Sequence, residues 1–294
     1  MSALRAYIQM TKPTIIILVA VTGLATMLSE GTFFDEPLRM SFCMALIIMA
    51  AGSANAFNQL IDHDIDSIME RTRKRRPLPR QQLSPRAAMI FASLMGLLST
   101  AGLWFFFNLL SALISLGTIL FYVFIYTLWL KRRHPYNIVI GGIAGSTAPL
   151  IASAAAHHSI TAVAWLGFSV IFMWTPPHFW ALALAIKDDY AKAGIPMLPN
   201  VCGDKRTKIE IVIYTLLLFP LTVLSLVWLK FHVALVFVAL LLWAWYFFET
   251  ARQIPKTTKP AYYRLFYVSI FYLFFYFIVL ATEGIRHFIW GLET

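Results

Sequence analysis

Nine stretches of mostly apolar residues, separated by polar segments, are the feature that most limits what this chain can fold into. A helix that crosses the hydrocarbon core of a bilayer needs about 20 such residues. Only 13% of the 294 residues are charged, whereas the charged share of a soluble domain approaches about a quarter. We therefore expect an all-α integral membrane protein in which residues 1–294 form a single transmembrane domain. The expected spans are residues 14–30, 41–61, 87–107, 109–130, 137–156, 162–186, 210–229, 232–249 and 265–287.

The basic residues predict how these helices are oriented. Of the 24 Lys and Arg residues, only Arg39, Lys230 and Arg286 fall in segments on one side of the nine expected helices. The others precede the first helix or follow the second, fourth, sixth and eighth. Because cytoplasmic loops carry an excess of Lys and Arg, this split predicts a cytoplasmic N-terminus and a periplasmic C-terminus in the cell inner membrane. It also accounts for the net charge of +10 without a nucleic-acid partner.

The second expected helix ends in polar side chains at a regular spacing. At about 100° and 1.5 Å per residue, Asn58, Asp62 and Asp66 fall about 40° apart on one stripe, each roughly 6 Å from the last. Oxygen ligands without thiols or clustered histidines suit a hard cation such as Mg²⁺, which is usually shared with substrate phosphates. A solvated turn is the alternative, but polar groups at the end of an apolar helix more often face a cavity. Asp64 and Glu70 are expected at the surface.

A second group of polar residues follows the sixth expected helix. Pro176 and Pro177 free backbone groups inside an apolar segment, which is tolerated where protein or a cavity satisfies them again. If the helix continued to Asp189, that carboxylate would share a face with His178 about 16 Å away. The pattern indicates a deep pocket with an anionic rim. A core histidine bonded to a neighbouring helix is the alternative reading of His178.

A weaker third group lies around the fourth loop. Lys131 and Arg132 follow the fourth expected helix, where basic residues are usually topology signals. They gain interest only if the loop lies beside the two acidic segments. The small residues from Gly141 to Gly145 open the next helix and would let it approach a neighbour closely.

Together these residues resemble the UbiA-type intramembrane prenyltransferases. That superfamily carries an Asn-x-x-x-Asp-x-x-x-Asp motif after its second helix and a second Asp-containing motif after its sixth. The runs from Asp62 to Arg75 and from Asp189 to Pro199, with the pair Pro177-His178, are similar to the haem O synthase branch. The resemblance extends over nearly the whole chain.

The resemblance implies transfer of farnesyl from farnesyl diphosphate to the vinyl group of haem b, with water addition and Mg²⁺, giving haem O and diphosphate. It places the site on the cytoplasmic side of a bundle embedded in membrane lipid. A downstream haem-modifying enzyme or a terminal oxidase assembly would be a fitting partner. Asn58, Asp62 and Asp66 would form the first metal and diphosphate motif, and Asp189 the second, with Asp188 possible beside it. The substrate-binding candidates are Arg73, Lys131, Arg132, His178, Asp188 and Lys192.

The ligand set of the second acidic motif stays undecided. Asp188 and Asp189 are adjacent and no third acid follows four residues later, which departs from the quinone-type relatives.

Three other readings of the function also stay open at this point. A quinone-precursor or chlorin acceptor would use the same first motif. A transporter would need polar groups on both sides of the bilayer midplane. A subunit of a respiratory complex would leave both acidic motifs unexplained.

Overall fold

The computed structural model describes residues 3–228 and 231–291, so Lys230 lies outside the described residues. Every regular element within these ranges is helical, which confirms the expected all-α class. The first half comprises α1 (Ala3–Met10), α2 (Pro13–Ser29), α3 (Pro37–Ile61), α4 (His63–Ile68), α5 (Glu70–Arg73), α6 (Pro85–Phe106), α7 (Leu109–Leu120), the π-helix η1 (Phe121–Trp129) and the 3₁₀ turn η2 (Leu130–Arg132). The second half comprises α8 (Asn137–Gly145), α9 (Ala148–His157), α10 (Ala162–Ala185), α11 (Lys187–Lys192), α12 (Leu198–Trp228), α13 (Val233–Gln253) and α14 (Lys259–Trp290).

The described helices contain eight segments long and apolar enough to cross a membrane, and α1 with α2 supplies a ninth as a pair bent by 55°. The nine positions match the nine expected stretches, which confirms a multi-pass membrane protein. One boundary differs clearly, because α12 begins at Leu198 rather than at residue 210. The polar segment before the apolar stretch is helical too, interrupted only at Gly203, whose φ of 78° is accessible to glycine.

Local sequence signals mark several helix starts. Ser84, Asn108 and Thr161 each accept a hydrogen bond on the side chain from the backbone N–H three residues later, as N-caps do. Proline occupies the first turn of α2, α3, α6, α9 and α14, where its missing N–H costs nothing.

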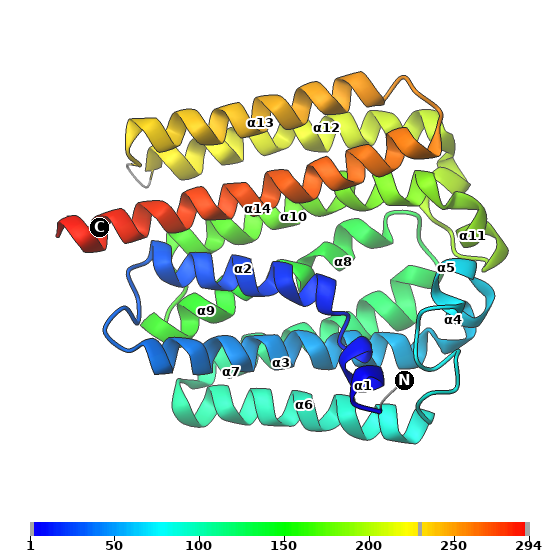
Figure 1. Cartoon of the computed structure of the whole chain (residues 1–294), viewed down its shortest axis with the longest axis horizontal. Coiled ribbons are helices and arrows are strands. Elements are labelled where there is room, and N and C mark those ends of the chain that lie inside the picture. The colour runs from blue at the N-terminus through cyan, green and yellow to red at the C-terminus, as the bar shows by residue number, and fades with distance from the viewer. Residues whose placement is uncertain (1–2, 229–230, 292–294) are drawn as a thin grey trace.

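The helices lie side by side in two groups joined by a central layer (Figure 1). In one group α3 packs against α6 and α7, and in the other α10 packs against α12 and α14, with α13 against both of these. Between the groups, α2 packs on α14, α3 and α9. Contact is close where α14 crosses the end of α2, because a Cβ at Gly284 would lie 1.9 Å from the carbonyl oxygen of Leu28.

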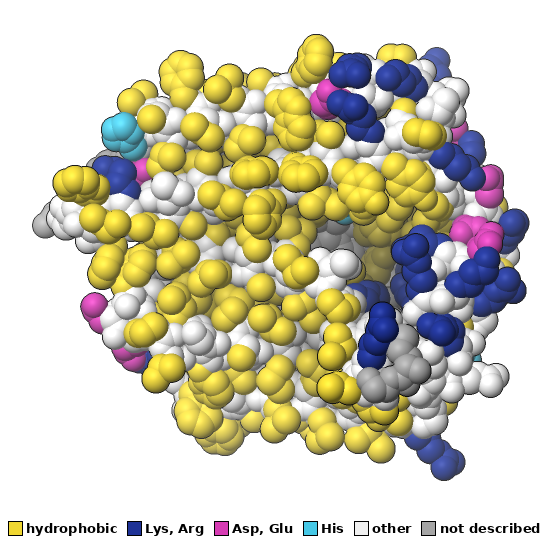
Figure 2. All heavy atoms as spheres, viewed as in Figure 1, with side chains coloured by type: hydrophobic (Ala, Val, Ile, Leu, Met, Phe, Trp, Pro, Cys, Tyr) yellow, Lys and Arg dark blue, Asp and Glu magenta, His cyan; other side chains and the backbone are white. Residues whose placement is uncertain are grey.

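The outer surface is apolar along the flank and basic at one end (Figure 2). Large side chains such as Phe105 and Leu38 are 75% and 86% exposed, as expected where lipid rather than water surrounds the protein. The basic end holds α1, α4, α5 and α11, while the C-terminal end of α14 lies at the opposite end (Figure 1). The N- and C-terminal ends of the described chain therefore lie at opposite ends of the bundle.

Candidate active site

A cavity of about 460 Å³ opens where the two helix groups meet at the basic end. Figure 2 shows a hollow at the boundary between the basic end and the apolar flank. Its walls come from the α1–α2 turn, the end of α3, α4 and α5, η1, α10, α11 and α14. The described side chains that line it are Gln9, Lys12, Pro13, Thr14, Ile15, Asn58, Gln59, Asp66, Met69, Arg71, Thr72, Arg75, Arg76, Tyr122, Tyr126, Lys131, His178, Phe179, Leu182, Tyr190 and Phe266.

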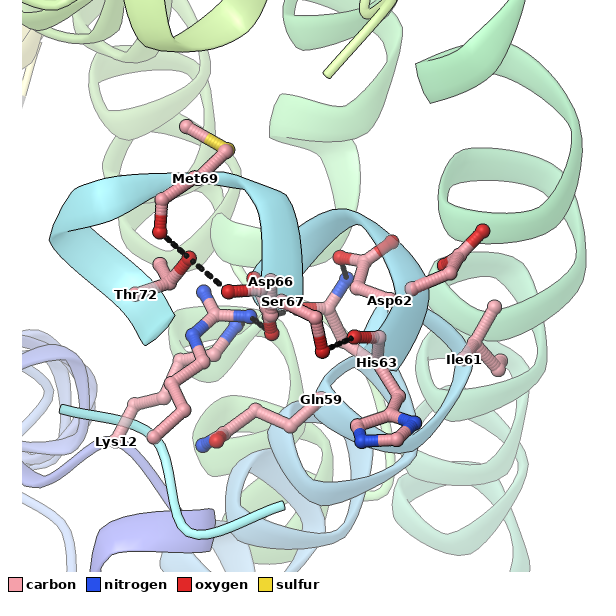
Figure 3. A network of polar contacts seen from close by, with 12 residues as sticks. Lys12, Gln59, Ile61, Asp62, His63, Asp66, Ser67, Met69 and Thr72 are labelled. Atoms are coloured by element: carbon pink, nitrogen blue, oxygen red, sulfur yellow. Dashed lines mark hydrogen bonds and ion pairs between the residues drawn. The ribbon is translucent and has the colours of Figure 1, made fainter. Parts of the chain in front are cut away.

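The structure brings Asn58, Asp62 and Asp66 together, but not on one continuous helix. Asp62 has φ −82° and ψ 10°, so α3 ends before it and α4 starts after it. The helical hydrogen-bond register nevertheless continues, from Asp62 N to Asn58 O at 2.9 Å and from Asp66 N to Asp62 O at 2.8 Å. All three residues are at most 2% exposed. The four-residue spacing is therefore kept across a bend at the end of α3, where Figure 3 shows Asp62 and Asp66.

Each member of this triad is paired with the side chain of a lysine or an arginine. Lys12 donates to Asn58 Oδ1 at 2.6 Å, Lys131 pairs with Asp62 Oδ2, and Arg76 pairs with Asp66 Oδ2. Asn58 in turn donates to Asp62 Oδ2 at 2.9 Å. These cations stabilise two buried carboxylates that would be costly if left unpaired.

Lys12 reaches the triad because the polar face of α3 fixes the turn between α1 and α2. Asn55 donates to the carbonyl oxygen of Thr11 at 3.0 Å, and Gln59 donates to those of Gln9 and Met10, both at 2.9 Å. Lys12 itself has a left-handed backbone with φ 55° and ψ 72°, which is uncommon for a side chain of this size and often marks a functional position. From the sequence, Lys12 was expected only as one of the basic residues that precede the first helix and orient the bundle.

Thr72 organises the basic segment around Asp66. Its hydroxyl lies within hydrogen-bond distance of the carbonyl oxygens of Asp66, at 3.1 Å, and Met69, at 3.3 Å (Figure 3). Its own carbonyl oxygen accepts from Arg76 N at 2.8 Å. Burial raises the pKa of Asp66, and the charge of Asp62 adds to this rise while Arg76 opposes it. A cation beside Asp66 therefore helps to keep it ionised.

The π-helix η1 forms one wall of the cavity. Its wide turns are rare and often lie at functional sites. Tyr122 and Tyr126 stack with ring centroids 5.1 Å apart and both line the cavity, while Thr127 accepts from Asn58 Nδ2 at 3.1 Å. A Cβ at Gly141 would lie 2.3 Å from the ring of Tyr126. This contact confirms the close helix approach expected from the small residues of α8.

His178 lies in the part of the wall that α10 and α14 form. The imidazole is stacked between the rings of Trp174 and Phe266, with ring centroids 4.1 Å and 4.4 Å from its own. Its Nδ1 lies 2.7 Å from the hydroxyl oxygen of Ser269. The ring also lines the cavity. It is thus both bonded to a neighbouring helix and presented to the cavity, which combines the two readings that the sequence left open.

The second acidic motif is arranged differently from the expectation. The helix does not continue from His178 to Asp189, because Ile186, with φ −124° and ψ 29°, ends α10. The inference that His178 and Asp189 share one helical face is therefore wrong. Asp188 is exposed and 3.7 Å from Lys259, and Asp189 is partly exposed at the start of α11. Tyr190, which sequence reasoning missed, is the α11 residue that lines the cavity.

The remaining substrate-binding candidates also lie away from the cavity wall formed by the described residues. Arg132 makes two 2.8 Å hydrogen bonds to Asp64, whose side chain is 61% exposed, and these bonds lower the pKa of that carboxyl. The expected surface position of Asp64 is confirmed. Arg73 and Lys192 are exposed; the pKa of Glu70 is lowered mainly by its hydrogen bond from Lys74, and the charges of Lys192 and Arg73 add to this shift.

Their place in the wall is taken by other basic residues. Arg71, Arg75 and Arg76 line the cavity with Lys12 and Lys131. The sequence offered a run of arginines but no signal to tell which of them face inward.

The oxygen atoms at the end of α3 fit a hard divalent cation. Asp62 Oδ1 is buried and has no hydrogen-bond partner among the described residues. Within the same ranges, no three His, Cys, Asp or Glu side chains come together as a metal cage. Two carboxylates and an amide oxygen, without such a cage, match the usual way of binding Mg²⁺, which keeps water and substrate phosphate oxygens among its ligands.

A second, apolar cavity of about 120 Å³ adjoins the first, and Ile15 and Tyr122 belong to both walls. It runs between α2, α3, α7 and the α8–α9 pair, and small side chains such as Ala51, Ala54 and Gly145 line it. The two cavities together form a polar chamber with an apolar extension.

Comparison with known proteins identifies the family of this chain. The profile of the UbiA prenyltransferase family matches residues 16–282. The chain belongs to the UbiA prenyltransferase family, which confirms the expected class of enzyme. The protoheme IX farnesyltransferase of Gloeobacter violaceus is 45% identical over 289 residues, covering 97% of this chain and 93% of the relative. The protoheme IX farnesyltransferase of Trichodesmium erythraeum is 40% identical, and the match covers 96% of this chain and 86% of the relative. The resemblance to haem O synthases is thereby confirmed.

Solved structures share the fold. A digeranylgeranylglyceryl phosphate synthase superposes with a TM-score of 0.77 at 17% identity, covering 97% of this chain and all of that one. A UbiA homologue from Archaeoglobus fulgidus, bound to dimethylallyl diphosphate and Mg²⁺, superposes with a TM-score of 0.70 at 14% identity. The match covers 94% of this chain and 99% of the homologue.

Proposed function

We propose that this chain transfers the farnesyl group of farnesyl diphosphate to a vinyl group of haem b, with addition of water, to give haem O and diphosphate. The observation that carries the proposal is the chamber itself. Five cationic side chains line it together with Asn58, Asp66 and His178, and three of these cations, Lys12, Lys131 and Arg76, pair with the Asn58–Asp62–Asp66 triad, in which Asp62 is buried behind the lining. The named relatives, protoheme IX farnesyltransferases, support the choice of substrates.

The excess of positive charge in the chamber suits a diphosphate. Arg71, Arg75 and Arg76 can bind its oxygens in a bidentate manner, and Lys12 and Lys131 act as point charges. Asn58, Asp62 and Asp66 would hold Mg²⁺, with Asp189 remaining a predicted further ligand. The metal would neutralise charge on the departing diphosphate. The cations of the chain would also neutralise this charge, and both effects favour breakage of the allylic C–O bond.

The apolar extension gives the farnesyl chain a place to lie. Its small side chains leave room between α3 and α8, and its walls keep water from the chain. Tyr122 lines both cavities, and its ring stacks on that of Tyr126, which lines the larger one. The two rings are positioned to stabilise positive charge on the allylic carbon by cation–π attraction.

The acceptor enters from the His178 wall. The terminal carbon of the vinyl group bonds to C1 of the farnesyl cation, which leaves positive charge on the carbon beside the pyrrole ring. Water adds there and loses a proton, so that a hydroxyethylfarnesyl group remains. His178 would contact the haem, either through iron or through the porphyrin, and its rigid stack fixes the approach.

The proposed location is the cell inner membrane with the chamber on the cytoplasmic side. The basic end of the bundle, which holds the chamber, supports this orientation. A downstream haem-modifying enzyme or a terminal oxidase assembly is the proposed partner that would consume the product.

Purified protein incubated with haem b, farnesyl diphosphate and Mg²⁺, followed by mass analysis of the pigment, tests the proposal. The expected product is haem O. Product formed only from a quinone precursor or a chlorin would overturn the acceptor while leaving the prenyl donor in place. An absence of prenyl transfer to any acceptor would overturn the proposal as a whole.

A further inference from the structure

The hydroxyl of Ser269 has two close partners but only one hydrogen. It donates to the carbonyl oxygen of Phe266, three residues earlier on α14, at 2.6 Å. It also lies 2.7 Å from Nδ1 of His178. A carbonyl oxygen can only accept, so the two contacts are both hydrogen bonds only when the single hydroxyl hydrogen points to Phe266 O; if it pointed to His178 instead, two oxygen atoms would lie 2.6 Å apart with no hydrogen between them. The contact with His178 can then be a hydrogen bond only if Nδ1 carries the proton and donates it to Ser269.

We propose that Ser269 is a positioning residue that holds His178 in its Nδ1–H tautomer, so that Nε2 presents a lone pair to the chamber as a ligand for haem iron. A neutral imidazole carries one proton, so a proton on Nδ1 leaves Nε2 bare. The inference rests on the proposed function, because it assumes that haem enters this chamber.

The surroundings prevent the ring from escaping this arrangement. Trp174 and Phe266 cover its two faces, with interplanar angles of 17° and 25°. Trp174 is itself fixed, since its indole N–H donates to the carbonyl oxygen of Ser269 at 2.7 Å. A half-turn of the imidazole would put a carbon atom against the Ser269 hydroxyl and lose the hydrogen bond. The ring edge that faces the chamber is therefore constant.

The arrangement matches a common feature of metal-binding histidines. Such residues usually donate their other ring N–H to a protein acceptor, which selects the tautomer, orients the ring and increases its basicity. Here a hydroxyl polarised by a backbone carbonyl is the acceptor. Without it, the proton could move to Nε2 and block the position that iron would occupy.

The tautomer can be measured without haem. Solid-state NMR of ¹⁵N-histidine-labelled protein in lipid bilayers distinguishes a protonated from a bare ring nitrogen, and the His178 signal is the one lost in His178→Gln. We expect protonated Nδ1 and bare Nε2 in the wild type and in Ser269→Thr, and a mixture of tautomers in Ser269→Ala. Protonated Nε2 in the wild type, or an unchanged tautomer in Ser269→Ala, would overturn the inference.

Haem titration followed by the Soret band supplies the second measurement. Loss of an acceptor behind a metal-binding histidine typically costs 10- to 100-fold in metal affinity, so Ser269→Ala should weaken haem binding by roughly that factor. Ser269→Thr should restore most of it. Thr282→Ala is the matched control, because Thr282 makes the same type of bond to Ile278 O on an exposed part of α14.

The two failures can be told apart. If the wild type binds no haem, the proposed acceptor fails, whatever the tautomer of His178. If the wild type binds haem through His178 but Ser269→Ala binds it equally tightly, the proposed function survives and the role of Ser269 is overturned. Thermal unfolding of each variant shows whether a loss of affinity reflects a loss of fold.

Discussion

Lys12 and Asn58 are joined by a 2.6 Å hydrogen bond although 46 positions separate them in the chain. The bond links the turn between α1 and α2 to the last turn of α3, and it places an ammonium group directly beside the acidic triad. The N-terminal segment of the chain thus takes part in the chamber. Its contribution can be tested together with that of the triad itself.

Lys12→Met should weaken binding of farnesyl diphosphate, because it removes one of five cations from the chamber and leaves Asn58 without this partner. We expect a rise in KM of about tenfold or more, since hydrogen bonds to charged groups contribute about 1.5–3 kcal/mol. The measurement is steady-state kinetics with varied diphosphate. Arg5→Met, on the exposed face of α1, is the control and should leave KM unchanged. Equal effects of the two substitutions would show that only the overall charge matters.

Asp62→Ala and Asp66→Ala should each lower turnover by orders of magnitude while haem binding stays largely intact. The lost interactions involve metal and diphosphate rather than porphyrin. Asp64→Ala removes an exposed carboxylate from the same segment and should have little effect. Single-turnover rates and haem titrations of the three variants provide the comparison. A defect in Asp64→Ala as large as that in Asp62→Ala would contradict the assignment of the triad.

Removal of divalent cations with EDTA should abolish turnover without unfolding the protein. The reason is that Asp62 Oδ1 is buried with no hydrogen-bond partner among the described residues, whereas the rest of the triad is held by Lys12, Lys131 and Arg76. Excess Mg²⁺ should restore activity, as measured by haem O formation. Full activity in EDTA would show that the basic residues suffice alone.

Gly141→Ala should displace Tyr126 and destabilise the protein by about 1–3 kcal/mol, the usual cost of overpacking. A Cβ there would lie 2.3 Å from the tyrosine ring, and the ring lines the chamber. Thermal unfolding and kinetics should both change. Gly117→Ala is the control, because its Cβ would meet nothing within 4 Å and alanine favours a helix by about 1 kcal/mol. If both variants behaved alike, the close contact between α8 and η1 would not matter.

Reporter fusions after Trp290 should be active for a periplasmic reporter and silent for a cytoplasmic one. Nine spans and the concentration of basic residues at the opposite end of the bundle lead to this expectation. Fusions in the segment after Arg80 serve as the internal control and should give the reverse pattern. An active cytoplasmic reporter after Trp290 would mean that the orientation is inverted.

The sequence alone determined the features that depend on neighbours along the chain. The apolar stretches identified the eight spans and the bent α1–α2 pair found among the described residues, because the length of a membrane helix is set by the bilayer. The four-residue spacing of Asn58, Asp62 and Asp66 predicted that they would lie together, and their hydrogen-bond register confirms it even across the bend at Asp62. The charge of the loops was likewise visible, since it is a property of composition.

Only the tertiary structure decided which side chains meet across the chain. Lys12 rather than Arg73 faces the triad, because Asn55 and Gln59 fix the turn that carries it. Ser269 meets His178 from 91 positions away. Such contacts depend on how separate helices pack, and no local spacing encodes them. The same limit applies at Asp189: a face shared with His178 required the helix to continue, but α10 ends at Ala185, and Tyr190 of α11 lines the chamber instead.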